Sequence, residues 1–137
     1  MEKENLRSVF KGRRVMITGD TGFKGSWLSL WLNELGADIL GYSLPPKQDK
    51  DLFNVLKLGK IIRHIDGDIR NYAFLKKAAD DFRPEFIFHL AAQAIVKTSY
   101  LDPKLTFDTN VMGSVNILEV IRNSDYLRSA IYVTSDK

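Results

Sequence analysis

The sequence predicts an α/β fold with a parallel sheet of about five strands and flanking helices. Three observations support this prediction. Short apolar stretches of strand length alternate with segments in which apolar residues recur at helical spacing. Three glycines, Gly19, Gly22 and Gly25, directly follow the first apolar stretch. The 137 residues are 45% hydrophobic and 27% charged, which is ordinary for one globular domain.

The first strand is expected at residues 14–18, which are mostly apolar and end at a glycine. Apolar residues then recur at helical spacing from Trp27 to Leu35, and Gly36 provides a natural helix end. The second strand is expected at residues 38–43, because two prolines follow it closely.

A weak helix at residues 51–58 and a third strand at residues 61–65 follow. Asn71 is a suitable N-cap for a helix that extends to Phe82, where an Arg-Pro pair ends it. Residues 85–91 are apolar and form the expected fourth strand.

The longest helix is expected to begin at Asp102 and Pro103, because proline in the first turn lacks only an N–H group that has no partner there. Residues 129–134 form the expected fifth strand. A sheet that ends at this strand exposes an edge, so we expect self-association. The apolar face of the longest helix should comprise Leu105, Met112, Val115, Leu118 and Ile121.

Charge and composition exclude several kinds of site. Lys and Arg number 20 and Asp and Glu 17, and this net charge of +3 is too small to indicate nucleic-acid binding. Cysteine is absent, which excludes thiolate metal ligands, thiol nucleophiles and disulfides. The charged start has no signal-peptide core, and no apolar run is long enough to span a membrane. We therefore expect a cytoplasmic protein without membrane or nucleic-acid partners.

The segment VMITGDTGFKGS favours a dinucleotide-binding loop over a loop for nucleoside triphosphates. The latter needs lysine directly after its last glycine, whereas Lys24 precedes Gly25 and Ser26 follows it. The strand, loop and helix order instead fits a Rossmann-type doubly wound sheet. In that fold Gly19 allows a sharp turn, Gly22 lets the backbone approach a pyrophosphate, and Gly25 lets the helix pack closely on the sheet. Free N–H groups around the glycines would then face the phosphates.

Nearby residues do not decide between NAD and NADP. Asp20 places a carboxylate in the loop, which should weaken phosphate binding unless it is turned away or paired. The second strand ends in Tyr42 and Ser43, where an Asp or Glu usually binds the ribose of NAD. Lys47 could favour a 2′-phosphate.

Longer stretches together resemble the extended short-chain dehydrogenase/reductase family of nucleotide-sugar enzymes. They are TGDTGFKGSWLSLWLNELGA, GYSLPP, FHLAAQAIVKTSYLDP, TFDTNVMGSVNILEVIR and VTSDK, and the similarity runs from about residue 12 to residue 137. HLAAQ and TNVMG carry the family likeness, and FKGSWL and TSDK point to its CDP-glucose dehydratase branch. The resemblance implies an NAD-dependent 4,6-dehydratase, with residues 1–137 forming part of its cofactor-binding domain.

The same resemblance implies roles for individual residues. Asp68 and Ile69 would meet the adenine, and Asn110 matches an asparagine that helps organise a catalytic lysine; otherwise it is a simple polar residue on a helix. His64 and His89 are more readily explained as hydrogen-bonded core residues than as metal ligands, and no metal site is expected. Leu90, Ala91, Ala92 and Gln93 would line the nicotinamide half. The implied cofactor-binding set is Gly19, Thr21, Gly22, Phe23, Lys24, Gly25, Tyr42, Ser43, Asp68, Ile69, Leu90, Ala91, Ala92 and Gln93.

The reaction that the resemblance implies converts CDP-glucose to CDP-4-keto-6-deoxyglucose. The C4 hydride moves to the nicotinamide, water leaves across C5 and C6, and the hydride returns to C6. Ser135 matches a residue that bonds the C4 oxygen, and Asp136 matches the acid that protonates the departing hydroxyl. Lys137 stands where related dehydratases carry a glutamate base, and a lysine could act there only with a lowered pKa.

The family's Tyr-x-x-x-Lys pair should follow later in such a protein. Within this sequence Tyr72 and Lys76 have that spacing but lie on an early helix, and no such pair occurs at the expected later place. We therefore expect the chain to be an amino-terminal cofactor-binding portion with essentially no dehydratase turnover alone. Two alternatives remain: a nucleotide-binding module without catalysis, and part of a related nucleotide-sugar epimerase or dehydratase.

Overall fold

A computed structural model describes residues 2–134, and five strands form one parallel sheet in the order β3-β2-β1-β4-β5. The strand order changes direction between β1 and β4, which is where doubly wound sheets bind ligands. The predicted fold class, a Rossmann-type parallel sheet with flanking helices, is therefore confirmed. The strands are β1 (Arg14–Thr18), β2 (Asp38–Ser43), β3 (Arg63–Asp66), β4 (Phe86–His89) and β5 (Ser129–Tyr132).

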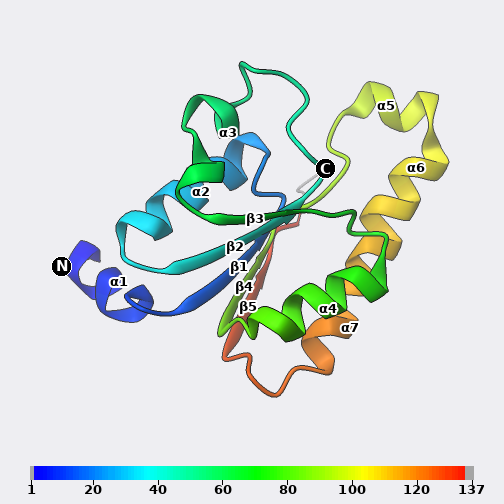
Figure 1. Ribbon diagram of the computed structural model, residues 1–137. Coiled ribbons are helices and arrows are strands. Elements are labelled where there is room, and N and C mark those ends of the chain that lie inside the picture. Colours follow the sequence, from blue (N-terminus) through cyan, green and yellow to red (C-terminus); the bar gives the residue numbers. More distant parts are fainter. Residues whose placement is uncertain (1, 135–137) are drawn as a thin grey trace.

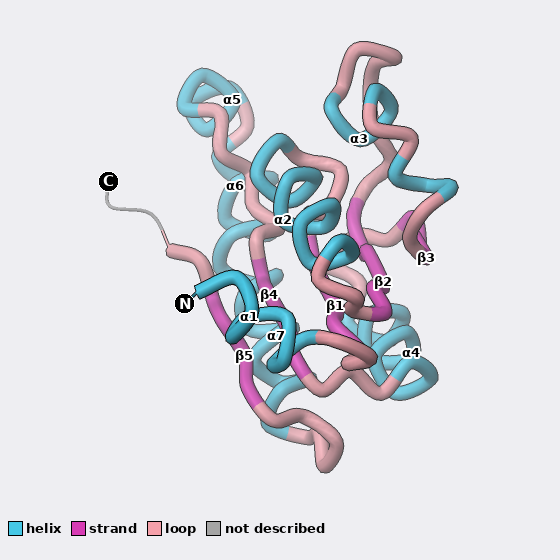
Figure 2. The backbone as a smooth tube through the Cα atoms, turned by 90° about the vertical axis from the view of Figure 1, so that its left-hand side faces the viewer, coloured by secondary structure: helices cyan, strands magenta, loops and turns pink. Residues whose placement is uncertain are grey.

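Helices cover both faces of the sheet (Figures 1 and 2). One face carries α1, α2 and α3, and the other carries α4 and α7. The short helix α5 lies beyond the carboxyl end of β4. The helical segments are α1 (Glu2–Phe10), α2 (Phe23–Glu34), α3 (Leu52–Val55), the 3₁₀ turn η1 (Leu58–Lys60), α4 (Tyr72–Phe82), α5 (Val96–Leu101), α6 (Pro103–Phe107), the π-helical turn η2 (Asp108–Met112) and α7 (Gly113–Arg122).

The central strand β1 is buried on both faces, as its apolar sequence predicts. Val15 and Ile17 belong to the core beneath α1, α2 and α3, together with Leu32 and Leu35. Met16 points to the other face, into the core formed with α4 and α7. This alternation follows from the two-residue period of a strand. It holds β1, and the loop that follows it, between two packed layers.

Three predicted helix ends match the structure. The side chain of Asn71 accepts a hydrogen bond from the backbone N–H of Phe74 at 3.1 Å, which caps α4. The side chain of Asp102 caps α6 in the same way at Leu105. Gly36 adopts a φ of +89°, the left-handed conformation that ends α2.

The sequence-based predictions missed two helices, α1 and α5. The helix α1 is held by packing rather than by a capping signal, since the ring of Phe10 lies 5.3 Å from that of Phe86. The third strand begins two residues later than predicted, at Arg63. None of the helices within residues 2–134 is both long and apolar enough to cross a membrane.

The predicted apolar face of the longest helix was wrong for three of its residues, whereas Ile121 packs against the core as predicted. Ile117 and Val120 are buried, whereas Met112, Val115 and Leu118 are about half exposed. The π-helical turn η2 contains more residues per turn than an α-helix, so a single helical period cannot be extended across it. Beyond this turn, the face that begins at Gly113 packs against the sheet.

Candidate functional site

A cleft with a volume of about 220 Å³ opens at the carboxyl ends of β1, β2 and β4. It lies at the change in strand order, where the fold class places a ligand. Leu105 and Thr109, from α6 and η2, close the cleft on the side of the sheet that carries α4 and α7. Of the residues predicted to bind the cofactor, the cleft is lined by Gly19, Thr21, Gly22, Tyr42, Ser43, Asp68, Ile69, Leu90, Ala91 and Ala92.

Each of the three positions in the loop requires glycine for a different structural reason. Gly19 adopts a φ of +79°, and a Cβ atom there would lie 2.8 Å from the backbone nitrogen of Ala91. A Cβ atom on Gly25 would lie 2.0 Å from the carbonyl oxygen of Gly19, so the first turn of α2 packs closely against the loop itself. A Cβ atom on Gly22 would meet only that same oxygen, at 3.3 Å. Gly22 therefore has one close neighbour, and its other side faces the cleft.

Three backbone amides at the first turn of α2 are free. Gly19 donates its N–H to the carbonyl of Tyr42 at 3.0 Å, and Gly22 donates to the carbonyl of Gly19 at 3.1 Å. The fold therefore uses these two amides, and they are not among the free N–H groups expected around the glycines. Among the described residues, the N–H groups of Phe23, Lys24 and Gly25 have no acceptor. These groups and the helix dipole can hold an anion.

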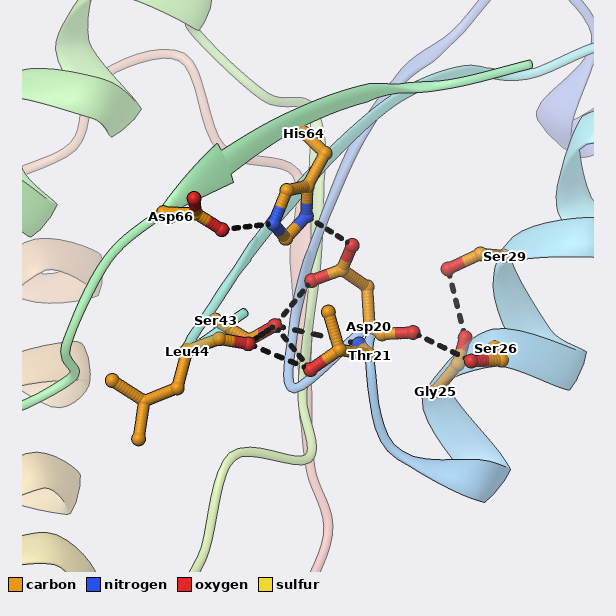
Figure 3. A network of polar contacts seen from close by, with 9 residues as sticks. All are labelled: Asp20, Thr21, Gly25, Ser26, Ser29, Ser43, Leu44, His64 and Asp66. Carbon is orange, nitrogen blue, oxygen red and sulfur yellow. Dashed lines mark hydrogen bonds and ion pairs between the residues drawn. The ribbon is translucent and has the colours of Figure 1, made fainter. Parts of the chain in front are cut away.

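The Asp20 carboxylate is turned away from these amides and is paired in a buried network (Figure 3). Its Oδ2 lies 2.7 Å from Nδ1 of His64, and its Oδ1 accepts a hydrogen bond from Ser43 Oγ at 2.9 Å. The Nε2 atom of His64 lies 3.0 Å from Asp66 Oδ1. A Cβ atom on Gly41 would lie 1.9 Å from Asp20 Oδ2, so glycine in β2 makes the space for this carboxylate. The condition that Asp20 be turned away or paired is met.

His64 is held between two carboxylates. Burial alone lowers the pKa of its imidazole, but the hydrogen bonds and charges of Asp20 and Asp66 outweigh burial, so the pKa is raised above 6.5. Below this raised pKa, the charge of protonated His64 balances that of the Asp20 carboxylate. His64 was predicted to be a hydrogen-bonded core residue, but its hydrogen bond to Asp20 was not predicted.

Thr21 fastens the loop to the end of β2. Its hydroxyl donates to the carbonyl of Leu44 at 2.8 Å and lies 2.9 Å from Ser43 Oγ. Ser43 is buried and donates its hydroxyl to Asp20, so its side chain holds the loop from the end of β2. Hydroxyl groups therefore occupy the corner where dinucleotide-binding domains for NAD commonly carry an acid.

At the far end of the cleft, Asp68 is paired with Arg70. Arg70 Nη2 lies 2.6 Å from Asp68 Oδ2, and Nε lies 3.0 Å from both carboxylate oxygens. Hydrogen bonds from Arg70 lower the pKa of Asp68. Tyr42 supports the same turn by donating its hydroxyl to the backbone carbonyl of Asp68, and burial, with the charge of Asp68, raises the pKa of Tyr42 to about 12. Sequence reasoning missed Arg70, although its spacing from Asp68 permits the pair.

The loop after β4 is held by Asn110, which lies in the π-helical turn η2. Asn110 Oδ1 accepts the backbone N–H of Gln93 at 2.7 Å, and Nδ2 donates to the carbonyl of Gln93 at 3.0 Å. The side chain of Gln93 bonds to Ile95 and Thr106, so it lies outside the lining of the cleft. Together these contacts fix the segment that contains Leu90, Ala91 and Ala92.

His89 is a hydrogen-bonded core residue. Its Nδ1 lies 2.6 Å from Thr18 Oγ1, and its ring centroid lies 4.9 Å from that of Tyr132. Burial lowers the pKa of His89 to about 4, so the ring is neutral at pH 7. Within the described part of the chain, no group of three or more His, Asp or Glu residues could hold a metal ion.

Five other predicted cofactor or catalytic positions lie apart from the cleft or outside the described residues. Phe23 lines a neighbouring pocket that shares Thr21 and Gly22 with the cleft, and Lys24 is exposed on the first turn of α2. The predicted catalytic residues Ser135, Asp136 and Lys137 lie outside the described residues. Their roles stay predictions.

Comparisons with known proteins agree with this geometry. The family model for GDP-mannose 4,6 dehydratase matches residues 16–136. The CDP-glucose 4,6-dehydratase of Salmonella typhimurium is 43% identical over 131 residues, which cover 96% of this chain and 36% of the relative. The chain thus spans a little over one third of the length of that curated relative.

Solved structures give the same picture. An epimerase from Methanothermobacter thermautotrophicus superposes with a TM-score of 0.80 at 23% identity, covering 98% of this chain and 38% of that one, which shows the fold. The UDP-glucose 4-epimerase of Thermus thermophilus, solved in complex with NAD, is 34% identical, with a TM-score of 0.68, and the match covers 80% of this chain and 33% of that one. The resemblance to extended short-chain dehydrogenases of nucleotide sugars is confirmed.

Proposed function

Because this chain belongs to the GDP-mannose 4,6 dehydratase family of nucleotide-sugar enzymes, we propose that it forms the cofactor-binding part of an NAD-dependent dehydratase. The proposed reaction converts CDP-glucose to CDP-4-keto-6-deoxyglucose. The 43% identity to the Salmonella typhimurium CDP-glucose 4,6-dehydratase supports this substrate. The FKGSWL and TSDK segments, which suggested the same branch from sequence, support it as well.

One structural observation carries the proposal. The N–H groups of Phe23, Lys24 and Gly25 have no acceptor among the described residues, and they lie at the start of α2 beside the cleft. Gly22 leaves space in front of the loop, and Asp20 is paired with His64 on the other side of it. This arrangement fits the pyrophosphate of a dinucleotide and removes the repulsion that a carboxylate in the loop would cause.

The remaining lining residues fit the two ends of such a molecule. The turn at Asp68 and Ile69 would hold the adenine, with Arg70 fixing the Asp68 carboxylate. Leu90, Ala91 and Ala92 would hold the nicotinamide half, where small side chains leave room for a ring. When bound, the nicotinamide would accept the hydride from C4 of the sugar and return it to C6.

The chain's own residues would then act on protons and position. We propose that Ser135 donates a hydrogen bond to the C4 oxygen and that Asp136 donates a proton to the departing C6 hydroxyl. Lys137 would remove the C5 proton if its ammonium loses a proton at neutral pH. Asn110 would act as a positioning residue, because both polar atoms of its side chain hold the backbone of Gln93.

Cofactor binding is tested by titrating the purified chain with NAD and NADP in a calorimeter. We expect saturable binding of a nicotinamide dinucleotide with one site per chain. Substituting Gly22 by Val should remove it without unfolding the protein, because the valine would occupy the open space in front of the loop. If neither dinucleotide binds, the proposed function is wrong.

The reaction class is tested with a chimera in which this chain replaces the matched segment of the Salmonella typhimurium relative. We expect the chimera to form the 4-keto-6-deoxy product from CDP-glucose. An Asp136→Asn variant of the chimera should lose most of the elimination, since the departing hydroxyl would lack its acid. A chimera that folds, binds the cofactor and still eliminates water with asparagine at position 136 would contradict the role of Asp136.

A nucleotide-sugar epimerase is the second candidate, supported by the 34% identity to the Thermus thermophilus epimerase. An epimerase needs neither an acid at Asp136 nor a base at Lys137, so the products of the chimera separate the two functions.

We also propose that the protein is cytoplasmic and that it self-associates through the edge strand β5, whose four residues are all exposed. Sedimentation of the purified chain tests the self-association.

A further inference from the structure

The helix α2 carries its large aromatic side chains on its outer face, away from the sheet. Phe23 is 70% exposed, and Trp27 and Trp31 are each about half exposed. The buried side of the helix consists of three small residues and one leucine, which are Gly25, Ser26, Ser29 and Leu32. A surface helix normally has polar residues outside and large apolar residues inside. Exposed tryptophans in a row are typical of protein interfaces, so the outer face of α2 is a candidate contact surface.

Two charged residues lie at the ends of this aromatic row, and their signs oppose the helix dipole. Lys24 is in the first turn of α2 and Glu34 is its last residue. The amino end of a helix favours acids and the carboxyl end favours bases, but α2 has no acid in its first turn and no base in its last. Within the described part of the chain, neither side chain forms an ion pair. Both charges are thus unfavourably placed in the single chain.

The outer face of α2 is complementary to itself. Its two charged residues and two tryptophans follow one another at spacings of three, four and three positions, which places them on one side of a helix: Lys24, Trp27, Trp31 and Glu34. This spacing is the same from either end, and its centre is Ser29. When two copies of α2 cross antiparallel at that residue, Trp27 of one copy meets Trp31 of the other. Lys24 of each copy then meets Glu34 of the other, at the helix end whose dipole it favours.

We propose that the outer face of α2 is a homodimer interface, in which two copies of this chain pair antiparallel about a two-fold axis. A second copy is the partner that fits, because a two-fold axis requires a surface that matches itself in shape and charge. In Figure 2, α2 lies between α1 and α3 on the face of the sheet that is turned toward the viewer. The contact is therefore distinct from pairing through the edge strand β5. It also does not depend on the cofactor.

Sedimentation of the purified chain at low salt tests the dimer. One short helix from each copy gives a small interface, so we expect a dissociation constant in the micromolar range. Trp27→Asp should weaken association about a hundredfold, because it places a carboxylate twice in the apolar centre of the contact. Since Trp27 is half exposed, this variant should keep its fold, which circular dichroism checks. The matched control is Leu118→Asp, at a half-exposed apolar residue of α7 on the other face of the sheet, and it should leave the contact unchanged.

Charge reversal tests the antiparallel geometry. Lys24→Glu alone and Glu34→Lys alone each place like charges at both ends of the contact, so each variant should associate about tenfold more weakly than the wild type. An equimolar mixture of the two variants should recover wild-type association, because unlike charges then meet at both ends. Both substitutions suit the helix dipole, so neither should destabilise the monomer.

Three results would overturn the proposal. The wild-type chain could remain a monomer up to millimolar concentration. Trp27→Asp could associate as tightly as the wild type, which would place the contact elsewhere, such as at β5. Finally, the two charge variants could associate normally when alone, or fail to recover association when mixed, and α2 would then not pair antiparallel through this face.

Discussion

The carboxylate of Asp20 lies 2.7 Å from Nδ1 of His64, which joins the glycine loop after β1 to the strand β3 across 44 residues of sequence. Asp20 is fully buried, and the side chain of His64 is 13% exposed, so water screens this contact little. The contact also directs the carboxylate away from the free amides of α2. The loop's fitness for an anion therefore depends on a residue two strands away in the sheet.

This pair predicts that the stability of the protein falls as the pH rises through the pKa of folded His64. The pKa of folded His64 is raised above 6.5, so its contribution is fully present below about pH 6.5 and is lost at higher pH. Urea unfolding at several pH values between about 6 and 9 measures this. In His64→Gln the free energy of unfolding should depend less on pH over that range, and equal slopes for the two proteins would contradict the role of His64.

Removing the charge of Asp20 should destabilise the protein. We expect Asp20→Asn to lower the free energy of unfolding by about 3 kcal/mol, because protonated His64 would lose the buried partner that balances it. Chemical denaturation at pH 6 measures the loss. Asp49→Asn is the matched control: it removes an exposed carboxylate in the segment before α3 and should change stability by less than about 0.5 kcal/mol.

Two neighbouring glycine substitutions should have opposite consequences. In Gly25→Ala the new methyl group would lie 2.0 Å from the carbonyl oxygen of Gly19, so this variant should lose about 3 kcal/mol of stability or fail to fold. In Gly22→Ala it would lie 3.3 Å from that oxygen, and the φ of −72° suits alanine, so stability should change little. Its affinity for dinucleotide should fall about tenfold, because the methyl group occupies the approach to the loop. Equal stability for the two variants would contradict this account of the loop.

The clamp between Asn110 and Gln93 predicts a local change in hydrogen exchange. In Asn110→Ala the backbone N–H of Gln93 loses its acceptor, so that amide should exchange faster, and stability should fall by about 2 kcal/mol for two lost hydrogen bonds. Amide exchange followed by NMR measures this at single residues. Asn123→Ala, at the end of α7, should leave the Gln93 amide unchanged. Unchanged exchange in Asn110→Ala would show that the clamp is not formed in solution.

The sequence predicted those parts of the fold that local signals determine. Residues 14–18 and 38–43 were identified as strands with the observed ends, because short apolar stretches there stop at Gly19 and before Pro45. Asn71 and Asp102 marked helix starts through capping, which also acts within a few residues. The buried face of α7 was missed because it is set by tertiary packing and by the π-helical turn before it.

The site divides in the same way. The glycine loop and the lining segments at Asp68 and Leu90 were recognised from local motifs and family resemblance. The partners of Asp20 were not, since a contact between residues 44 positions apart leaves no local pattern. The sequence did predict that the Asp20 carboxylate must be paired or turned away from the loop, because it would otherwise repel a phosphate. The sequence also could not show which amides of the loop are bonded within the fold and which are free for a ligand. That depends on the turn at Gly19.

The most direct test of the account is an NMR titration of the amides of residues 19–25 with NAD and NADP. We expect the N–H signals of Phe23, Lys24 and Gly25 to shift strongly and to become protected from exchange on binding. The amide of Gly19 should stay protected throughout by its bond to Tyr42. If a dinucleotide binds while the signals of Phe23, Lys24 and Gly25 stay unchanged, or if none binds, the start of α2 is not a pyrophosphate site.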